Sequence, residues 1–151
     1  MPRKHHIHDR RTYIERPIDP TPDDLQYKAF EPQLDALWQC ITEVTGCDRS
    51  IVYIRSRAAV HVEPRHIFFH LAYTSLGKVP LRVIGQYAGG RDHSTVIHGS
   101  DNIAGLAQYD KRLADLLGRI KDHLVGRLPA NEDPELRVKL FQPYLGFIAG
   151  G

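Results

Sequence analysis

The amino-acid sequence predicts an all-α fold, a compact bundle of about six helices that contains a helix-turn-helix. Apolar residues recur at helical spacing in several segments, and many of these segments begin at a proline or an aspartate and stop at a glycine. No segment shows a clear strand pattern, although Ile51, Val52 and Ile54 are β-branched and would also suit a strand.

The composition indicates one domain with tails. The chain has 151 residues, and we expect a flexible N-terminal arm over 1–30, a helical domain over 31–126 and a C-terminal tail over 127–151. The mean hydropathy is -0.37, no apolar run approaches the ~20 residues of a membrane span, and no secretory signal is present. We therefore expect a cytoplasmic protein with two reduced cysteines and no membrane partner.

The N-terminal arm is predicted from its prolines and mixed charge, which leave residues 1–30 without helical or strand periodicity. Three histidines in it, His5, His6 and His8, invite a metal site. A short histidine cluster without cysteine partners is more often an adventitious ligand, so we expect neither a metal nor a cofactor.

The first helix is expected over residues 31–45, where Pro32 starts it and Gly46 stops it. Its apolar residues form one stripe at helical spacing, which predicts a core-facing side: Leu34, Leu37, Trp38, Ile41 and Val44. Asp48 then caps a short segment whose apolar residues, Ile51, Val52 and Ile54, suit either a helix or a strand.

Two further helices follow from the same signals. Residues 55–62 are expected to form a basic loop, after which Pro64 begins a helix that ends near residue 76. The last helix is capped by Asp110, and its apolar stripe is regular: Leu113, Leu116, Leu117, Ile120 and Leu124.

Between them lies the stretch GGRDHSTVIH, residues 89–98, around which the chain is organised. Residues 80–88 predict a short helix with Pro80 at its first position, and Gly89 and Gly90 end it. Asp92 stands at the N-cap of a second helix, whose buried face we expect to include Val96, Ile103 and Leu106. Three polar residues remain in its exposed first turn: His93, Ser94 and Thr95. This plan is a helix-turn-helix, in which the start of the second helix enters the DNA major groove.

The charge distribution agrees with a nucleic-acid partner more than the net charge of +2 does. Between Arg55 and His98 there are six lysines and arginines against two acids, whereas from Gly99 onward the two signs balance at seven each. A local basic excess is what a phosphate-binding face requires.

The stretch GGRDHSTVIH resembles the signature of the C-terminal DNA-binding domain of the bacterial replication initiator DnaA, and the resemblance extends over roughly 34–124. It implies that His93 and Ser94 read bases in the major groove, with Asp92 beside them, and that Arg57 enters the minor groove. It also implies that Arg65 and His66 contact base and backbone and that Leu81 touches the backbone.

For two more residues the chemistry alone provides the expectation. Thr95 can bond a base or a phosphate, and its methyl group can meet a thymine methyl. Arg91 is left with two roles, a structural ion pair or a phosphate contact.

The sequence departs from the DnaA pattern at three positions near this site. His66 stands where the family usually has glutamine, and Glu63 and Tyr73 stand where it usually has basic residues. Glu63 would repel a phosphate and Tyr73 cannot neutralise one, so we expect weaker or altered DNA binding.

No enzymatic activity is expected. The sequence has no phosphate loop for ATP, no nucleophile elbow and no pair of carboxylates placed for catalysis. His93 and His98 are five residues apart and so lie on different faces of a helix. Because the motor domain of the initiator is missing, the expectation is a stand-alone DNA-binding module, monomeric by default.

Two functions compete. The first is sequence-specific binding of double-stranded DNA at sites like initiator boxes, which would regulate replication initiation or transcription. The alternative is an adaptor of the replication machinery that works through the initiator or the sliding clamp. Its support is Gln142, Leu145 and Phe147, which resemble the Q-x-x-L-x-[LF] clamp-binding peptide, although Tyr144, Leu145 and Phe147 would also pack on their own domain.

Overall fold

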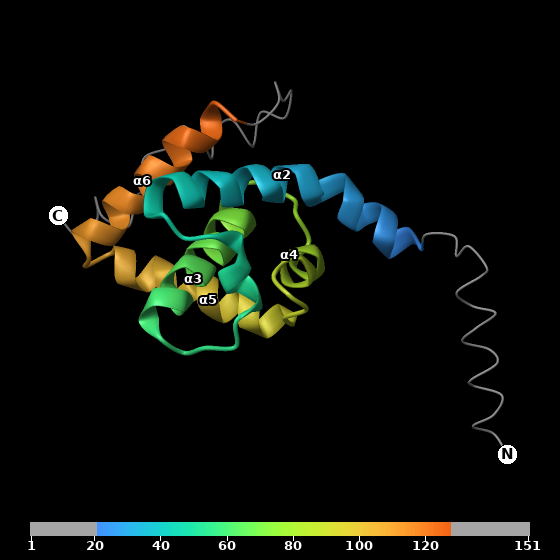
Figure 1. Ribbon diagram of the computed structural model, residues 1–151, viewed down its shortest axis with the longest axis horizontal. Coiled ribbons are helices and arrows are strands. Elements are labelled where there is room, and N and C mark those ends of the chain that lie inside the picture. The colour runs from blue at the N-terminus through green and yellow to red at the C-terminus, as the bar shows by residue number, and fades with distance from the viewer. Residues whose placement is uncertain (1–20, 128–151) are drawn as a thin grey trace, which may run out of the picture.

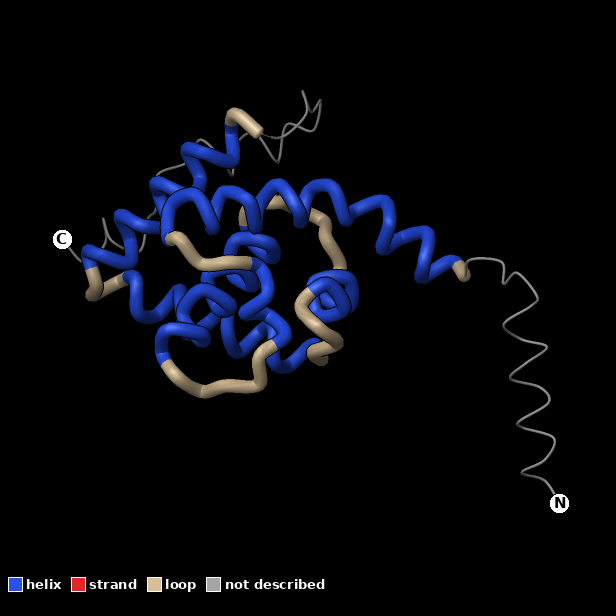
Figure 2. Tube along the Cα trace, in the orientation of Figure 1, coloured by secondary structure: helices blue, strands red, loops and turns tan. Residues whose placement is uncertain are grey.

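The computed structural model describes residues 21–127, and over that range it contains five α-helices, one 3-10 helix and no strand (Figures 1 and 2). The predicted all-α fold is therefore confirmed. The histidines His5, His6 and His8 lie outside the described residues, as does the tail beyond residue 127. None of the helices described is long and apolar enough to cross a lipid bilayer.

The first helix, α2 (Pro22–Thr45), begins at Pro22, so the prediction that it starts at Glu31 was wrong. The missed signal is a capping box. The Thr21 hydroxyl accepts a hydrogen bond from the Asp24 N–H at 3.1 Å, and the Asp24 carboxylate accepts one from the Thr21 N–H at 3.0 Å. Pro22 sits at the first helical position, where its missing N–H costs nothing.

The first turns of α2 extend beyond the other helices in Figure 1. Helix α4 (Leu81–Tyr87) contacts them through Arg82. Arg82 of α4 hydrogen-bonds the side chain of Gln26, and its guanidinium lies 3.7 Å from the carboxylate of Asp23. Pro32 lies inside α2 and removes one internal hydrogen bond without ending the helix.

The second correction concerns the start of α3 (Ala59–Thr74), which was expected at Pro64. The 3-10 helix η1 (Arg49–Tyr53), capped by Asp48 as expected, is followed by a connection only five residues long, 54–58. Pro64 is buried inside α3. A proline costs a helix chiefly the hydrogen bond of its own nitrogen, and burial of its ring against the core offsets that loss.

Helix α5 (His93–Ala107) and helix α6 (Lys111–Val125) begin at their predicted caps, Asp92 and Asp110. Val96 and Ile103 are buried as expected, but Leu106 is 49% exposed, so its place on the buried face of α5 was predicted wrongly. The buried face of α5 continues from Ile103 to Ala107, four residues on, and leaves Leu106 on the solvent side.

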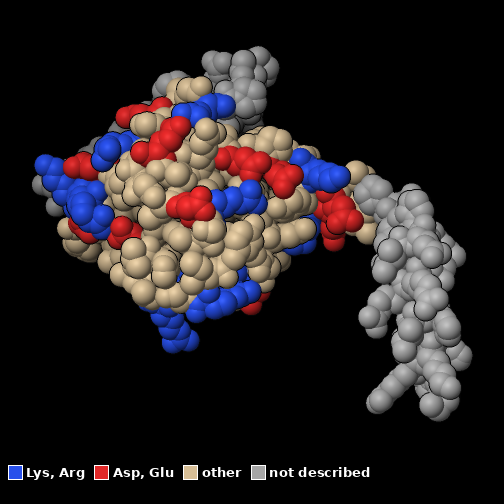
Figure 3. Space-filling model, in the orientation of Figure 1, with Lys and Arg blue, Asp and Glu red and all other residues tan. Residues whose placement is uncertain are grey.

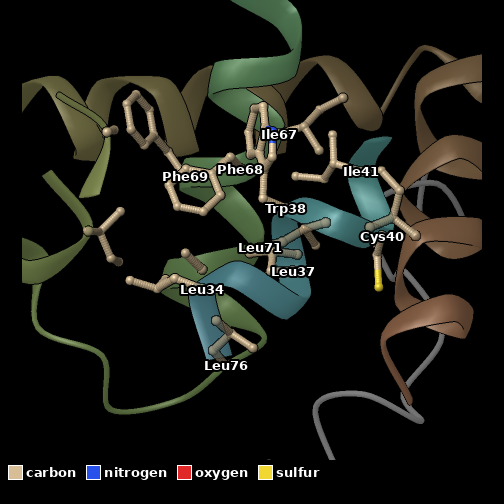
Figure 4. Packing of buried hydrophobic residues seen from close by; sticks show 14 of the residues in the cluster. Leu34, Leu37, Trp38, Cys40, Ile41, Ile67, Phe68, Phe69, Leu71 and Leu76 are labelled. Atoms are coloured by element: carbon tan, nitrogen blue, oxygen red, sulfur yellow. The ribbon is translucent and has the colours of Figure 1, made fainter. Parts of the chain in front are cut away.

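The core lies where α3 crosses beneath α2 (Figure 4). The Trp38 ring meets Phe68 edge-on with the ring centres 5.2 Å apart, and Phe68 stacks on Tyr87 of α4 at 5.3 Å. Phe68 therefore joins the three helices α2, α3 and α4, and Trp38 is buried in this core, in agreement with its predicted place in the apolar stripe of the first helix.

Close packing of α3 on α5 determines where α5 begins. A Cβ atom at Gly99 would lie 2.7 Å from the Phe69 ring and 2.9 Å from the His66 ring, so the two helices approach at a residue without a side chain. One turn along α3 from His66, the buried His70 ring forms a hydrogen bond of 3.2 Å with the hydroxyl of Ser100, the residue after Gly99.

His70 predicts a pH dependence of stability. Burial, with Lys121 nearby, lowers the pKa of His70 from 6.5 to about 4. Between these pH values the unfolded chain binds a proton that the folded chain does not, so the free energy of unfolding decreases as pH falls through this window. We expect a loss of up to about 3 kcal/mol from this group between pH 6.5 and pH 4.

Urea unfolding at several pH values measures this effect. The variant His70→Gln should flatten the dependence between pH 6.5 and pH 4, whereas His93→Gln, at an exposed position, should leave it unchanged. An identical pH dependence in His70→Gln and the wild type would contradict the assignment.

Candidate nucleic-acid interface

The turn between α4 and α5 is closed by hydrogen bonds onto one oxygen. The carbonyl of Gly85 accepts from the Gly90 N–H at 3.0 Å and from the Arg91 N–H at 2.9 Å. Gly89 and Gly90 have φ angles of 84° and 81°, the left-handed region that the sequence predicted for them. Pro80 was expected at the first helical position and instead stands at the N-cap of α4.

Asp92 organises the first turn of α5. Its Oδ1 accepts hydrogen bonds from the Thr95 N–H and from the Ser94 hydroxyl, both at 2.9 Å. The backbone hydrogen bond from Thr95, then that of the Ser94 side chain, lowers the pKa of this carboxyl below its usual value. Asp92 is therefore a charged N-cap, and the Ser94 hydroxyl is oriented before any ligand arrives.

The first turn of α5 presents polar side chains to solvent on a rigid base. His93, Ser94 and Thr95 are all exposed, while Val96 is fully buried behind them. A helix N-terminus also carries unpaired N–H groups and a partial positive charge, which favour an anion such as a phosphate.

Three arginines fasten the connection 54–58 to the glycine turn, and they do so through backbone carbonyls. Arg65, only 7% exposed, donates to the oxygens of Ile54 at 2.8 Å and Ser56 at 2.7 Å. The other contacts come from Arg91 to Val52 and Ile54, at 2.7 and 3.3 Å, and from Arg55 to Gly89, at 3.2 Å.

These contacts bear on the two roles left open for Arg91. Within the described residues its guanidinium bonds carbonyl oxygens and forms no ion pair. Burial, and then the charges of Arg65 and Arg55, lower the pKa of Arg91, and burial followed by Arg55 lowers that of Arg65. The cluster holds positive charge that carbonyl dipoles stabilise and no carboxylate cancels.

Arg57 stands at the exposed part of this connection, and no hydrogen bond ties its side chain to the described residues. On its N-terminal side, the Ser56 carbonyl accepts from Arg65, and the Ile54 carbonyl accepts from Arg65 and Arg91. The structure therefore places a free guanidinium on a fixed segment beside the start of α5.

His66 and Leu81 flank this region. The Asn102 amide lies 3.1 Å from Nδ1 of the His66 ring, an interaction that joins α3 to the outer side of α5 and that the sequence did not reveal. Burial, then Arg65 and Arg91, lowers the pKa of His66, which favours the neutral ring. Leu81 is half-buried at the first position of α4.

The two departures from basic residues differ in their surroundings. The Glu63 carboxylate is bound by both terminal nitrogens of Arg112, at 2.7 and 3.2 Å, so its charge is compensated by α6. Tyr73 is 45% exposed on the solvent side of α3.

Charge is unevenly distributed on the surface shown in Figure 3. Lysine and arginine side chains gather at its lower edge, over the connection between η1 and α3, whereas acidic side chains are prominent along the side of α2. The proposed clamp-binding residues Gln142, Leu145 and Phe147 lie outside the described residues.

The turn predicts a large effect of Gly85→Ala. A Cβ atom at this position would lie 2.0 Å from the Arg91 carbonyl oxygen, so the turn must open to admit it. We expect the variant to lose about 2 kcal/mol or more in urea unfolding. Gly105→Ala is the matched control, since a Cβ there meets nothing within 4 Å, and it should gain up to about 1 kcal/mol. Equal stability of the two variants would contradict the geometry.

Arg65 and Arg57 are predicted to differ in their contribution to stability, because Arg65 is bonded within the fold and Arg57 is exposed. Arg65→Ala removes two partly buried hydrogen bonds to backbone carbonyls and should lower the free energy of unfolding by about 2 kcal/mol. Arg57→Ala, at an exposed position in the same connection, should change it by less than about 0.5 kcal/mol. Thermal or urea unfolding decides this, and comparable losses in both variants would mean that Arg57 also supports the fold.

Comparison with known proteins agrees with this geometry. Residues 34–103 match the family model described as the bacterial DnaA protein helix-turn-helix. The chain is 33% identical over 90 residues to the chromosomal replication initiator protein DnaA of Xanthobacter autotrophicus, which covers 59% of this chain and 17% of that protein. It is 38% identical over 71 residues to DnaA of Roseiflexus castenholzii, covering 47% of this chain and 15% of that protein.

DnaA of Rhodopseudomonas palustris is 32% identical over 93 residues, covering 61% of this chain and 19% of that protein. The chain thus spans less than a fifth of the length of these curated relatives. No solved structure matches it. The family model covers α4, the glycine turn and α5 up to Ile103, the elements that form the helix-turn-helix. Residues 34–103 of this chain therefore match the bacterial DnaA helix-turn-helix family.

Proposed function

We propose that this chain binds double-stranded DNA sequence-specifically, at sites resembling initiator boxes, and regulates replication initiation or transcription. One observation carries the proposal: the exposed first turn of α5 stands on a closed glycine turn within a segment of the DnaA helix-turn-helix family. The start of the second helix is the part of this motif that enters the major groove.

The three exposed side chains of this turn have the chemistry for base readout. His93 can donate to the N7 or O6 of a purine or pack on a thymine methyl group. The Ser94 hydroxyl donates to Asp92, which leaves its oxygen free to accept, and the Thr95 methyl can contact thymine. Asp92 supports these contacts as the cap of the helix, and a carboxylate at this position can accept from a base amino group.

The minor-groove contact is assigned to Arg57. An exposed guanidinium on a fixed segment can enter a narrow A·T-rich minor groove, where negative potential is concentrated. Arg91 and Arg55 link this segment to the glycine turn, so the minor-groove and major-groove elements share one support.

The remaining predicted residues take supporting roles in this proposal. The guanidinium groups of Arg65 and Arg91 donate to backbone carbonyls, so their main effect is to position Arg57 and the first turn of α5. His66 and Leu81 border the same region, where they can contact the DNA backbone. With a neutral His66 and an uncharged Tyr73, the affinity is expected to be lower than that of a site with basic residues at the corresponding places.

Fluorescence anisotropy tests the proposal, with a duplex that contains an initiator box and a scrambled duplex, at about 50 and 200 mM salt. The box should bind more tightly, and His93→Ala should weaken binding to it by about tenfold while leaving scrambled DNA little affected. Arg57→Ala should also weaken binding and reduce its salt dependence by about one unit of slope.

The matched control is His98→Ala, which removes another exposed histidine from α5, one turn further from its N-terminus. It should preserve the preference for the box. Equal binding of both duplexes, or no binding of either, would mean that this surface does not read sequence.

A further inference from the structure

A groove lies on the side of the molecule where α2 ends and where α3 and α6 begin. It has a volume of about 300 Å³, and apolar side chains form much of its lining. Val60 at its edge is 67% exposed, Leu116 is half-buried, and Ile67 belongs to the core beneath. An exposed valine and a half-buried leucine around an open apolar hollow indicate a surface suited to a docked apolar segment.

The charges of the groove are already satisfied. Its lining includes two charged residues, Glu63 and Arg112, and these bind each other through two hydrogen bonds. An occupant therefore needs no charge of its own, and burial of an uncharged segment beside this pair leaves no new charge unpaired.

The same chain carries a segment of matching chemistry. Residues 140–148 read LFQPYLGFI and contain no charged residue, whereas the preceding part of the tail is rich in charged and polar residues. Five large apolar side chains recur within it at short intervals: Leu140, Phe141, Leu145, Phe147 and Ile148.

The chain beyond α6 is long enough for this segment to reach the groove. Arg127, the last described residue, bonds the Glu43 carboxylate, which also lies 3.2 Å from the His123 ring. Glu43 precedes Cys47 by about one helical turn, and Cys47 lines the groove. The twelve residues 128–139 can span up to about 40 Å, so they reach the groove with slack, and their tether raises the local concentration of the segment.

We propose that residues 140–148 dock in the groove between α2, α3 and α6, with Leu145 and Phe147 covering Val60, Leu116 and the Cys47 thiol. The segment closes the apolar surface of its own domain. This assignment is independent of DNA binding, because it uses the side of α3 that carries Glu63 and not the first turn of α5.

Cys47 provides the probe. The reaction of its thiol with N-ethylmaleimide is measured in the full chain and in the double variant Leu145→Ser, Phe147→Ser, and tandem mass spectrometry locates the label. Cys40 reacts slowly in either protein, since it is buried and burial raises its pKa to about 11. We expect Cys47 to react about tenfold faster in the double variant.

Two further variants make the test specific. Leu136→Ser alters the tail outside the docking segment and should leave the rate at the wild-type value. Val60→Glu places a charge at the edge of the groove, at a position exposed enough to leave the fold intact, and should raise the rate as the double variant does. Unfolding curves verify that each variant remains folded.

Equal Cys47 reactivity in the wild type and the double variant would overturn the proposal. Protection that disappears on dilution would overturn it as well, since it would assign the groove to a second copy of the chain. A direct check uses Phe147→Cys under mild oxidation: the expected product is an intramolecular disulfide with Cys47, formed about tenfold faster than with the control Asn131→Cys.

Discussion

The carbonyl oxygen of Gly85 accepts the N–H groups of both Gly90 and Arg91, and the rest of the interface depends on this arrangement. It closes the turn between α4 and α5, which sets where Asp92 stands and therefore where α5 begins. A side chain at Gly85 would collide with the Arg91 carbonyl, so the turn leaves no room for adjustment. Because core packing holds α4 through Tyr87 and α5 through Gly99, the exposed first turn is fixed relative to the whole domain.

The arginines around this turn hold its backbone in place and also keep their positive charge. A guanidinium can be held by carboxylates, which neutralise its positive charge, or by backbone carbonyls, which do not neutralise it. Arg55, Arg65 and Arg91 use carbonyls, so the surface beside α5 keeps a positive potential while its backbone is immobilised. On the opposite side of α3, by contrast, Glu63 is paired with Arg112, and that region presents an apolar groove with compensated charge.

Local chemistry made much of this predictable. Gly89 and Gly90 need a left-handed backbone, and Asp92 and Asp110 have short carboxylates that reach N–H groups two or three residues on, so the turn and two helix starts followed from adjacent residues. The exposure of His93, Ser94 and Thr95 followed from helical periodicity around the buried Val96. The start of α2 is also determined by adjacent residues, the capping box of Thr21 and Asp24. The prolines around it favoured the interpretation of an irregular arm, so this signal was missed.

The sequence by itself determined the all-α class, the helix-turn-helix and the polar first turn of its second helix, because these depend on residues within a turn or two of one another. Only the tertiary structure decided how Arg65, Arg91, His66 and Glu63 are used. Their partners, the carbonyls of Ile54 and Val52, Asn102 and Arg112, are brought to them from other elements by packing of the core. A long polar side chain can reach several partners, and which one it meets is fixed by the crossing of helices that periodicity does not specify.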